Sequence, residues 1–271
     1  TTFGNIPYSE ALDYRNPVPV YDDAATVYAD ILDRLDNALA SFALGGTGFQ
    51  AADVLYNGDV DQWIKFGNSL KLKLAMLLAD VDNVVWVDLH GETPEHVDEA
   101  KEILADIFGF HPLTIEDCVE IRNQPKVEAF TNYLFLIVHG IKPGETGPTN
   151  FATKELDGYL GTNFVVTFHK ERFASIKNVK QKVRSSTFVC ERGAAYLLHS
   201  ILDELVDHYM PIVDDFDRSI NDFEDRVFEM GRSSNSVLGE IMDLRRSVAR
   251  LRRISARQRE VLYRISHGEF P

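Results

Sequence analysis

An adjacent pair of carboxylates, Glu116 and Asp117, lies near the end of the short apolar segment "HPLTIEDC". Neighbouring carboxylates repel each other, so such a pair is typical of a helix cap, of a cation site, or of solvated surface charge. The segment that follows, "RNQPKVE", is basic and is constrained by its proline. The residues alone leave all three interpretations open.

A second group of polar side chains recurs within one predicted helix. His199, Asp203 and Asp207 are spaced i, i+4 and i+8, so they lie on one helical face in a pattern that could hold zinc. The polar edge of an ordinary amphipathic helix gives the same pattern. We favour that second interpretation for these three residues.

Several aromatic residues near the N-terminus are candidates for stacking on sugars: Tyr8, Tyr14, Tyr21 and Trp63. Trp63 also lies on an apolar helical stripe, so we expect it in a core. No catalytic constellation is evident in the sequence, because serines, histidines and cysteines are scattered and no glycine-rich phosphate loop follows a predicted strand. We therefore expect that the chain is not an enzyme.

The composition bounds the partners of the chain. Its formal net charge of −14 argues against nucleic acid, because phosphate binding needs a basic surface. Cys118 and Cys190 have no metal-binding or redox spacing and are interpreted as buried thiols. The longest apolar run, "YLFLIVHGI" at 133–141, is too short to span a membrane and predicts a buried strand. The first residues carry no export signal and no initiator methionine, which indicates a processed chain or a fragment.

The elements that must position these residues fall into three predicted parts. Apolar residues recur every three or four positions over 27–42 and again over roughly 59–80, which predicts an all-helical segment at 1–82, with Asp22 and Asp23 available as caps. Residues 83–190 alternate a strand, an amphipathic helix closed by Gly109 and two longer strand-rich stretches. This pattern predicts an α/β domain with α/β/α layers.

Residues 191–271 are predicted to form long helices of opposite charge. An acidic helix carries ten carboxylates against two arginines between residues 203 and 229, for a net charge of −8. A basic helix follows the break "GRSSNS" and carries eight arginines against three carboxylates, for a net charge of +5. Such helices should pack antiparallel or present opposite charges to neighbouring subunits. Pro211 should bend the acidic helix.

Residues 83–271 resemble the cytoplasmic portion of the CorA family of magnesium and divalent-cation channels. The resemblance runs in order through six segments: "VWVDLHG", "FGFHPLTIEDC", "NQPKVEAFTNYLFLIVHGI", "LGTNFVVTFHKE", "AAYLLHSILDELVDHYMPIVDDFDRSINDFED" and "LRRSVARLRRISARQREVLYRISHGEFP". It implies a funnel of five identical subunits, each with an α/β domain, an acidic helical hairpin and a stalk helix that continues into the membrane. In this chain the stalk stops at Pro271, before the membrane helices and the Gly-Met-Asn pore signature of the family.

The resemblance also implies a function for the carboxylates. It places Glu116 and Asp117 at a subunit interface that binds regulatory Mg²⁺, and it places Asp203 at a second regulatory ion, with Co²⁺, Ni²⁺ or Zn²⁺ as alternative cations. Magnesium is a hard ion that one or two carboxylates commonly hold. The stalk aspartate that faces the first site from a neighbour lies beyond Pro271. We therefore expect an ion-sensing part at the cytoplasmic face of the inner (cell) membrane, with a zinc-transporting relative as an alternative.

Residues 1–82 instead resemble an internal piece of the SusD-like family, helical outer-membrane lipoproteins that capture glycans. The segments that carry this resemblance are "TTFGNIPYSEAL" and "LYNGDVDQWIKFGNSLKLKLAMLLADV". It implies glycan binding as an alternative function. One family works outside the cell and the other faces the cytoplasm, so we interpret the chain as a chimeric, fused or composite sequence.

Overall fold

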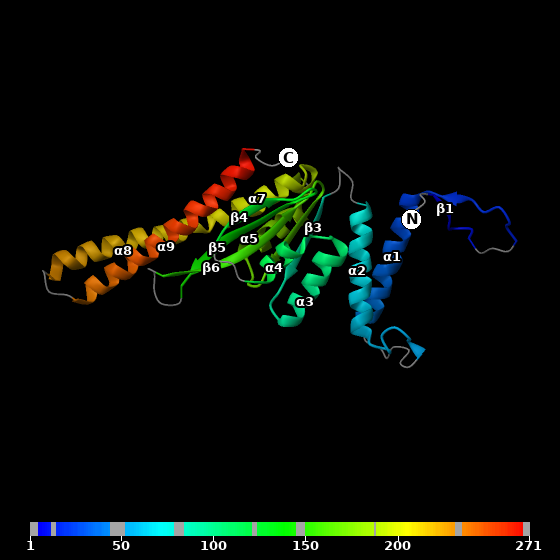
Figure 1. Cartoon of the computed structure of the whole chain (residues 1–271), viewed down its shortest axis with the longest axis horizontal. Helices are drawn as coiled ribbons and strands as arrows, with labels where there is room; N and C mark the ends of the chain where they lie inside the picture. Colours follow the sequence, from blue (N-terminus) through cyan, green and yellow to red (C-terminus); the bar gives the residue numbers. More distant parts are fainter. Residues whose placement is uncertain are drawn as a thin grey trace. The chain divides into compact units, whose positions relative to one another are not determined.

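The computed structural model describes residues 5–11, 15–43, 52–78, 84–120, 124–144, 150–186, 188–230 and 235–267. The chain divides into two compact units, residues 1–80 and residues 81–271 (Figure 1). Within the described part of the chain, no helix combines the length and the apolar character that crossing a membrane requires.

The first unit contains the predicted helical pair, α1 (Ala24–Ala43) and α2 (Val60–Leu78). Asp23 Oδ2 accepts hydrogen bonds from the backbone N–H groups of Ala25 and Thr26 in the first turn of α1, which confirms its role as a cap. The helices approach closely at Gly67, where a Cβ atom would lie 2.7 Å from Leu39 Cδ2. A short antiparallel ribbon of β1 (Ile6–Pro7) and β2 (Tyr21–Asp22) adds to the predicted helices.

The second unit is built on a five-stranded sheet in the order β3-β7-β6-β5-β4. The pair β3–β7 is parallel, and all other neighbouring strands are antiparallel. The sheet consists of the following strands: β3 (Val85–His90), β4 (Lys126–Ala129), β5 (Leu134–Pro143), β6 (Phe151–Leu160) and β7 (Phe164–His169).

Helices cover both faces of this sheet, so most side chains of the strands β5 and β7 are buried. One face packs against α3 (Pro94–Glu102), the π-helical segment η2 (Ile103–Ile107) and α4 (Pro112–Val119). Gly109 follows the continuous stretch of α3 and η2 and ends it at φ +64°, a backbone conformation that favours glycine. The other face packs against α5 (Ala174–Ser185), α7 (Ala194–Asp207) and the C-terminal part of the last helix. The predicted layered architecture is confirmed.

A long hairpin of α8 (Tyr209–Met230) and α9 (Asn235–Ser266) extends from the sheet (Figure 1). Its apolar seam joins Phe216 and Phe223 of α8 to Leu244 and Leu251 of α9. The prediction that Pro211 bends a continuous helix is wrong. Instead α7 ends at Asp207 and a new helix begins at Tyr209, which puts the proline in a first turn where no ladder hydrogen bond is lost.

A short four-residue helix, α6 (Phe188–Glu191), connects α5 to α7. The predicted boundary at residue 190, between an α/β domain and a helical part, stays a prediction. α7 lies after this boundary and packs on the sheet, and α8 follows α7 directly.

Two side chains from the hairpin cover an open edge of the sheet. β4 pairs only with residues 134–137 of β5, so the backbone of His139 lies beyond the end of β4. Gln258 Oε1 accepts a hydrogen bond from the His139 N–H at 2.8 Å, and the Tyr209 hydroxyl donates to the His139 carbonyl at 2.7 Å. Gln258 is buried, with 4% of its surface exposed. The hairpin is therefore anchored to the sheet by polar contacts that satisfy a strand edge.

Replacing Gln258 with alanine removes the acceptor of a buried backbone N–H. We expect the free energy of unfolding of the second unit to fall by about 1–3 kcal/mol. Chemical denaturation followed by circular dichroism measures this loss. The matched control is Arg259→Ala, since Arg259 is exposed and next in sequence, and it should change stability by less than about 0.5 kcal/mol. Equal stabilities of the two variants would contradict the anchoring role.

Candidate functional site

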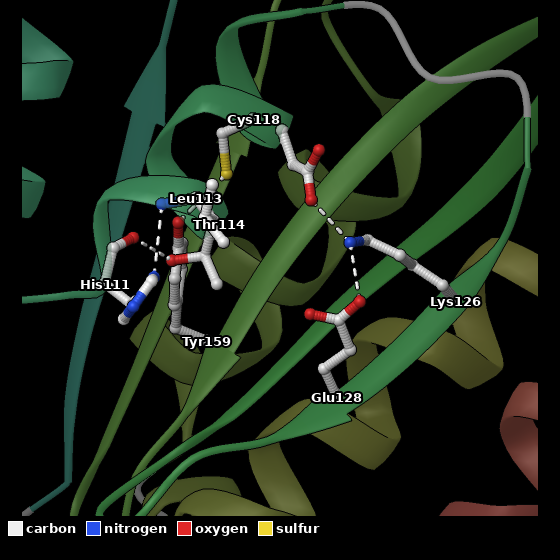
Figure 2. Close-up of polar contacts among 8 residues, drawn as sticks. His111, Leu113, Thr114, Cys118, Lys126, Glu128 and Tyr159 are labelled. Carbon is white, nitrogen blue, oxygen red and sulfur yellow. Dashed lines mark hydrogen bonds and ion pairs between the residues drawn. The ribbon is translucent and has the colours of Figure 1, made fainter.

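The helix that carries the predicted carboxylate pair is capped by other residues. Pro112 occupies its first position, and His111 Nδ1 accepts a hydrogen bond from the Leu113 N–H at 3.2 Å (Figure 2). The Thr114 hydroxyl donates to the His111 carbonyl at 2.8 Å. The first turn of α4 contains no acidic residue. The cap interpretation of the carboxylate pair is therefore wrong.

Burial of the neighbouring residues turns the pair outward. Ile115 and Cys118 pack in the core beneath α4, so Glu116 is exposed and Asp117 is half-buried at the rim of the sheet. Both carboxylates lie in the C-terminal half of the helix, where the helix dipole disfavours negative charge. A positive charge nearby is needed to offset this cost.

Lys126, the first residue of β4, supplies that charge. Its Nζ lies 2.5 Å from Asp117 Oδ2 and 2.8 Å from Glu128 Oε1, so one ammonium group bridges two carboxylates (Figure 2). Burial by itself disfavours the charged ammonium, but the hydrogen bonds to Asp117 and Glu128 outweigh it and raise the pKa of Lys126. Asp117 is therefore held by a cation of the protein itself.

A layer of buried acidic and weakly acidic groups lies behind α4. Burial, followed by the charge of Glu155, raises the pKa of Asp157 well above its usual range. The Cys118 thiol lies 3.2 Å from the Tyr159 hydroxyl, and burial raises its pKa as well (Figure 2). Cys118 is a buried thiol, as predicted, whereas the side chain of Cys190 lies outside the described part of the chain.

The structure does not bring Asp203 near the pair. Asp203 is exposed on α7, whose Leu202 and Leu205 pack on the opposite face of the sheet from Ile115 and Cys118 of α4. The sheet therefore separates the two acidic positions within one chain. No group of three or more histidine, cysteine or acidic side chains among the described residues is arranged to hold a metal ion.

The zinc interpretation of His199, Asp203 and Asp207 fails for a geometric reason. Residues i and i+8 of a helix are about 12 Å apart along its axis, which is too far to share one ion. His199 instead lies with its ring parallel to that of Tyr196, at a centroid distance of 6.0 Å. The three residues form the polar edge of α7.

The aromatic residues of the first unit serve its own packing. Trp63 Nε1 donates to Asp53 Oδ2 at 2.6 Å, and its half-buried ring packs edge-to-face on neighbouring aromatic rings. The Tyr8 hydroxyl donates to a carboxylate of α1. Tyr21 is 67% exposed, and Tyr14 lies outside the described residues. Among the described residues, Tyr21 is therefore the one exposed ring of the four aromatic residues that were candidates for stacking on sugars.

A second polar cluster, centred on Asp88, was not foreseen. Asp88 accepts hydrogen bonds at 2.6 Å from Thr167 Oγ1 and from Lys180 Nζ, and it lies 3.2 Å from His169 Nε2. Burial by itself raises the pKa of Asp88, but the hydrogen bond from His169, followed by those from Lys180 and Thr167, outweighs it and lowers the pKa. This carboxylate ties β3 and β7 to α5. Asp88 stands within the quoted segment "VWVDLHG". Its partners on β7 could not be identified there, because they lie about eighty residues further along the chain.

Comparison with known families matches the two units to different models. The model of the CorA-like Mg²⁺ transporter protein matches residues 81–270. The SusD-like model, described as starch-binding and associating with the outer membrane, matches residues 1–90.

Curated relatives align with the second unit. The "Putative metal ion transporter YfjQ" of Bacillus subtilis is 34% identical over 180 residues, which are 66% of this chain and 53% of the relative. The "Cobalt/magnesium transport protein CorA" of Thermotoga maritima is 27% identical over 184 residues, which are 68% of this chain and 51% of the relative. The chain thus spans about half the length of these relatives.

Solved structures share the fold. The soluble domain of CorA from Methanocaldococcus jannaschii superposes with a TM-score of 0.56 at 21% identity, covering 67% of this chain and 69% of that one. The ZntB cytoplasmic domain from Vibrio parahaemolyticus gives a TM-score of 0.53 at 14% identity, covering 69% of this chain and 72% of that one.

The Asp88 cluster generates a pH-dependent prediction. Because the folded-state pKa of Asp88 is depressed, its contribution to stability is present above the unfolded-state pKa and is lost as the pH falls through the lower folded-state value. We expect Asp88→Asn to lower the free energy of unfolding by about 2 kcal/mol at pH 7. The difference from wild type should shrink below about pH 4.

Urea denaturation at pH 7 and pH 3 measures this difference. Asp98→Asn is the control, because Asp98 lies exposed on α3 with one i,i+3 partner. A deficit of Asp88→Asn that is the same at both pH values would show that the charge of Asp88 contributes nothing.

Proposed function

This chain belongs to the CorA family, and from this premise we propose that residues 81–270 form the ion-sensing part of a transporter of Mg²⁺ or a related divalent cation. The family is one of transporters, so the chain is not an enzyme. In this proposal the second unit lies at the cytoplasmic face of the inner membrane. The membrane segments belong to the portion of such a transporter that the chain does not span.

The observation that carries the proposal is the position of the carboxylates. Glu116 and Asp117 lie on one side of the sheet, and Asp203 is exposed on the other. An ion at either position needs further ligands from a second chain or from water. In a ring of identical subunits each chain meets its two neighbours through two different surfaces. Two separate ion positions on opposite sides of one chain suit that geometry, and the family resemblance suggests five subunits.

The ligand chemistry favours magnesium. All the proposed ligands, Glu116, Asp117 and Asp203, offer carboxylate oxygen, which hard ions such as Mg²⁺ prefer, whereas Zn²⁺ is commonly bound by imidazole or thiolate. Mg²⁺ keeps several waters and needs only one or two carboxylates. Co²⁺, Ni²⁺ and Zn²⁺ remain alternative cargoes of the parent transporter.

Lys126 sets the affinity of the first position. An ion that approaches Asp117 must displace the ammonium group or bind through water, because Lys126 already neutralises that carboxylate. We therefore expect a dissociation constant near the millimolar range, which corresponds to about 4 kcal/mol per ion.

Sensing follows from a difference in affinity between two arrangements of subunits. An ion shared between neighbouring chains favours the arrangement in which the ligands of both chains are close together. Loss of the ion removes that preference, and repulsion between the carboxylates favours separation. The two acidic positions thus couple ion concentration to subunit packing.

Glycan binding by residues 1–82 is the weaker candidate. The similarity to the SusD-like model supports it, but sugar stacking needs exposed aromatic faces. The ring of Trp63 is engaged with aromatic neighbours and its N–H with Asp53. We therefore assign no glycan function to this unit.

Magnesium should stabilise the chain through the acidic positions. With a dissociation constant of about 1 mM, 10 mM Mg²⁺ contributes about 1.4 kcal/mol per site by mass action. This corresponds to a rise of about 3–6 °C in the melting temperature. The double variant Asp117→Asn/Asp203→Asn should respond less to Mg²⁺, and its melting temperature without the ion should not rise, because Asp117 loses its ion pair with Lys126.

Differential scanning calorimetry with and without Mg²⁺ measures these shifts. The control is Asp98→Asn/Asp225→Asn, which removes the same charge at exposed positions outside the proposed sites. Equal magnesium shifts in all three proteins would mean that the ion acts only by screening. Sedimentation velocity in the same buffers tests assembly, since Mg²⁺ should increase the population of oligomers in wild type and in the control but not in the double variant.

Removal of the competing ammonium should strengthen binding at the first position. Lys126→Met keeps the apolar stem and deletes the charge, so Asp117 and Glu128 are left to attract an ion. We expect Mg²⁺ affinity to rise about fivefold, which corresponds to about 1 kcal/mol of changed electrostatic energy near the surface. Isothermal titration calorimetry measures the affinity.

Lys101→Met is the matched control. Lys101 forms an exposed ion pair with Asp98 at 2.8 Å, so its loss changes the net charge equally but away from the site. Unchanged or weaker Mg²⁺ binding by Lys126→Met would sink the idea that Lys126 competes with the ion.

A further inference from the structure

A pocket of about 390 Å³ lies where α9 passes the open edge of β5. Its polar lining comes from four parts of the second unit: the segment before β4, the strands β5 and β6, and helix α9. The side chains that concern us are Gln124, His139, Thr153, Arg250, Arg253 and Arg257. The volume is in the range of pockets that bind small molecules.

Three arginines of one helix dominate this pocket. Arg250, Arg253 and Arg257 are spaced i, i+3 and i+7, so their guanidinium groups project from one face of α9. Arg250 Nη1 donates to the Phe151 carbonyl at 3.2 Å, and its guanidinium carbon lies 4.9 Å from the centre of the Phe151 ring. These contacts hold Arg250 in place and use only part of its donor capacity.

The other two arginines of the pocket, Arg257 and Arg253, differ in their contacts with the protein. Arg257 donates a hydrogen bond to the side-chain amide oxygen of Gln124, which connects α9 to the segment before β4. Arg253 is exposed and lines the pocket midway between the other two. A guanidinium group offers five donors for a ligand.

None of the three guanidinium groups forms an ion pair with a carboxylate in the described part of the chain. Elsewhere in this unit basic groups meet acids directly, as Arg226 does with Glu240 at 2.8 Å. The chain as a whole carries a net charge of −14, so three arginines without acidic partners around one hollow go against its composition.

One acidic group contacts the lining from outside it, at His139. Glu155 Oε2 is 3.6 Å from His139 Nε2, and Glu155 is not among the lining residues. The lining therefore offers guanidinium, amide and hydroxyl donors with no carboxylate to compete with an anion.

We propose that this pocket binds a phosphate-bearing anion of the size of pyrophosphate or of a nucleotide polyphosphate. Guanidinium groups bind phosphate oxygens through paired, charge-assisted hydrogen bonds, and three of them converge here. Thr153 and the amide group of Gln124 supply neutral donors at the rim. A bound phosphate links α9 to the segment before β4. Without a ligand, the hydrogen bond from Arg257 to the neutral amide oxygen of Gln124 joins these two parts.

The test is calorimetric titration of the whole chain with pyrophosphate, tripolyphosphate and ATP in a metal-free buffer that contains sulfate at constant ionic strength. We expect saturable binding of pyrophosphate by wild type and at least a tenfold loss of affinity in Arg253→Gln. Arg253 makes no contact in the described part of the chain that folding requires, so the variant should keep the wild-type melting temperature.

Arg259→Gln is the matched control, since it removes the same charge from an exposed position of α9 outside the pocket. It should change affinity by less than about twofold. Tighter binding of ATP than of tripolyphosphate would identify a nucleotide ligand, and equal binding would identify the phosphate chain alone. Absence of binding, or equal losses in Arg253→Gln and Arg259→Gln, would overturn the proposal and leave the arginines as a solvated helix face.

Discussion

Both faces of the five-stranded sheet must be covered, and this requirement limits where charged groups can lie near the sheet. Apolar clusters lie on both faces of the sheet, and helices pack over each of them. Carboxylates then lie at the rims, on the outer faces of the helices, or inside, where partners hold their charge or burial raises their pKa. Glu116 and Asp203 lie on outer faces, Asp88 is paired, and burial raises the pKa of Asp157.

The same requirement explains why the sheet ends are polar. Beyond Ile137, no strand of the described residues pairs with the outer side of β5, and an open edge would leave backbone groups without partners. The hairpin closes this edge with Tyr209 and Gln258, so a buried glutamine stands within an otherwise apolar helical stripe. The pocket lined by arginines lies beside this closure, because α9 approaches the edge there without filling it.

The sequence predicted the elements far better than their polar partners. Apolar periodicity indicated both units, the layered α/β class and the oppositely charged hairpin, since each depends on residues close together in the chain. Lys126 stood in a quoted segment, but its bond to Asp117 depends on β4 folding back beside α4. Nothing near Gln258 in the sequence indicates its role, because that role depends on a strand more than a hundred residues earlier. Pro211 predicted a bend, although a proline three residues after the C-cap His208 also marks the end of a helix.

The ion-sensing function that we propose requires two states of similar free energy, and in this proposal the pairing of Asp117 with Lys126 supplies that balance. Without the ammonium group that bridges them, the carboxylates of Asp117 and Glu128 would repel each other. The ammonium of Lys126 neutralises these charges in the ion-free state, so that state stays folded and intact. A divalent ion then adds only the difference between its own attraction and that of the lysine it replaces. A small difference of this kind gives a response that reverses readily, whereas an unpaired acidic site would bind the ion too tightly to report changes in its concentration.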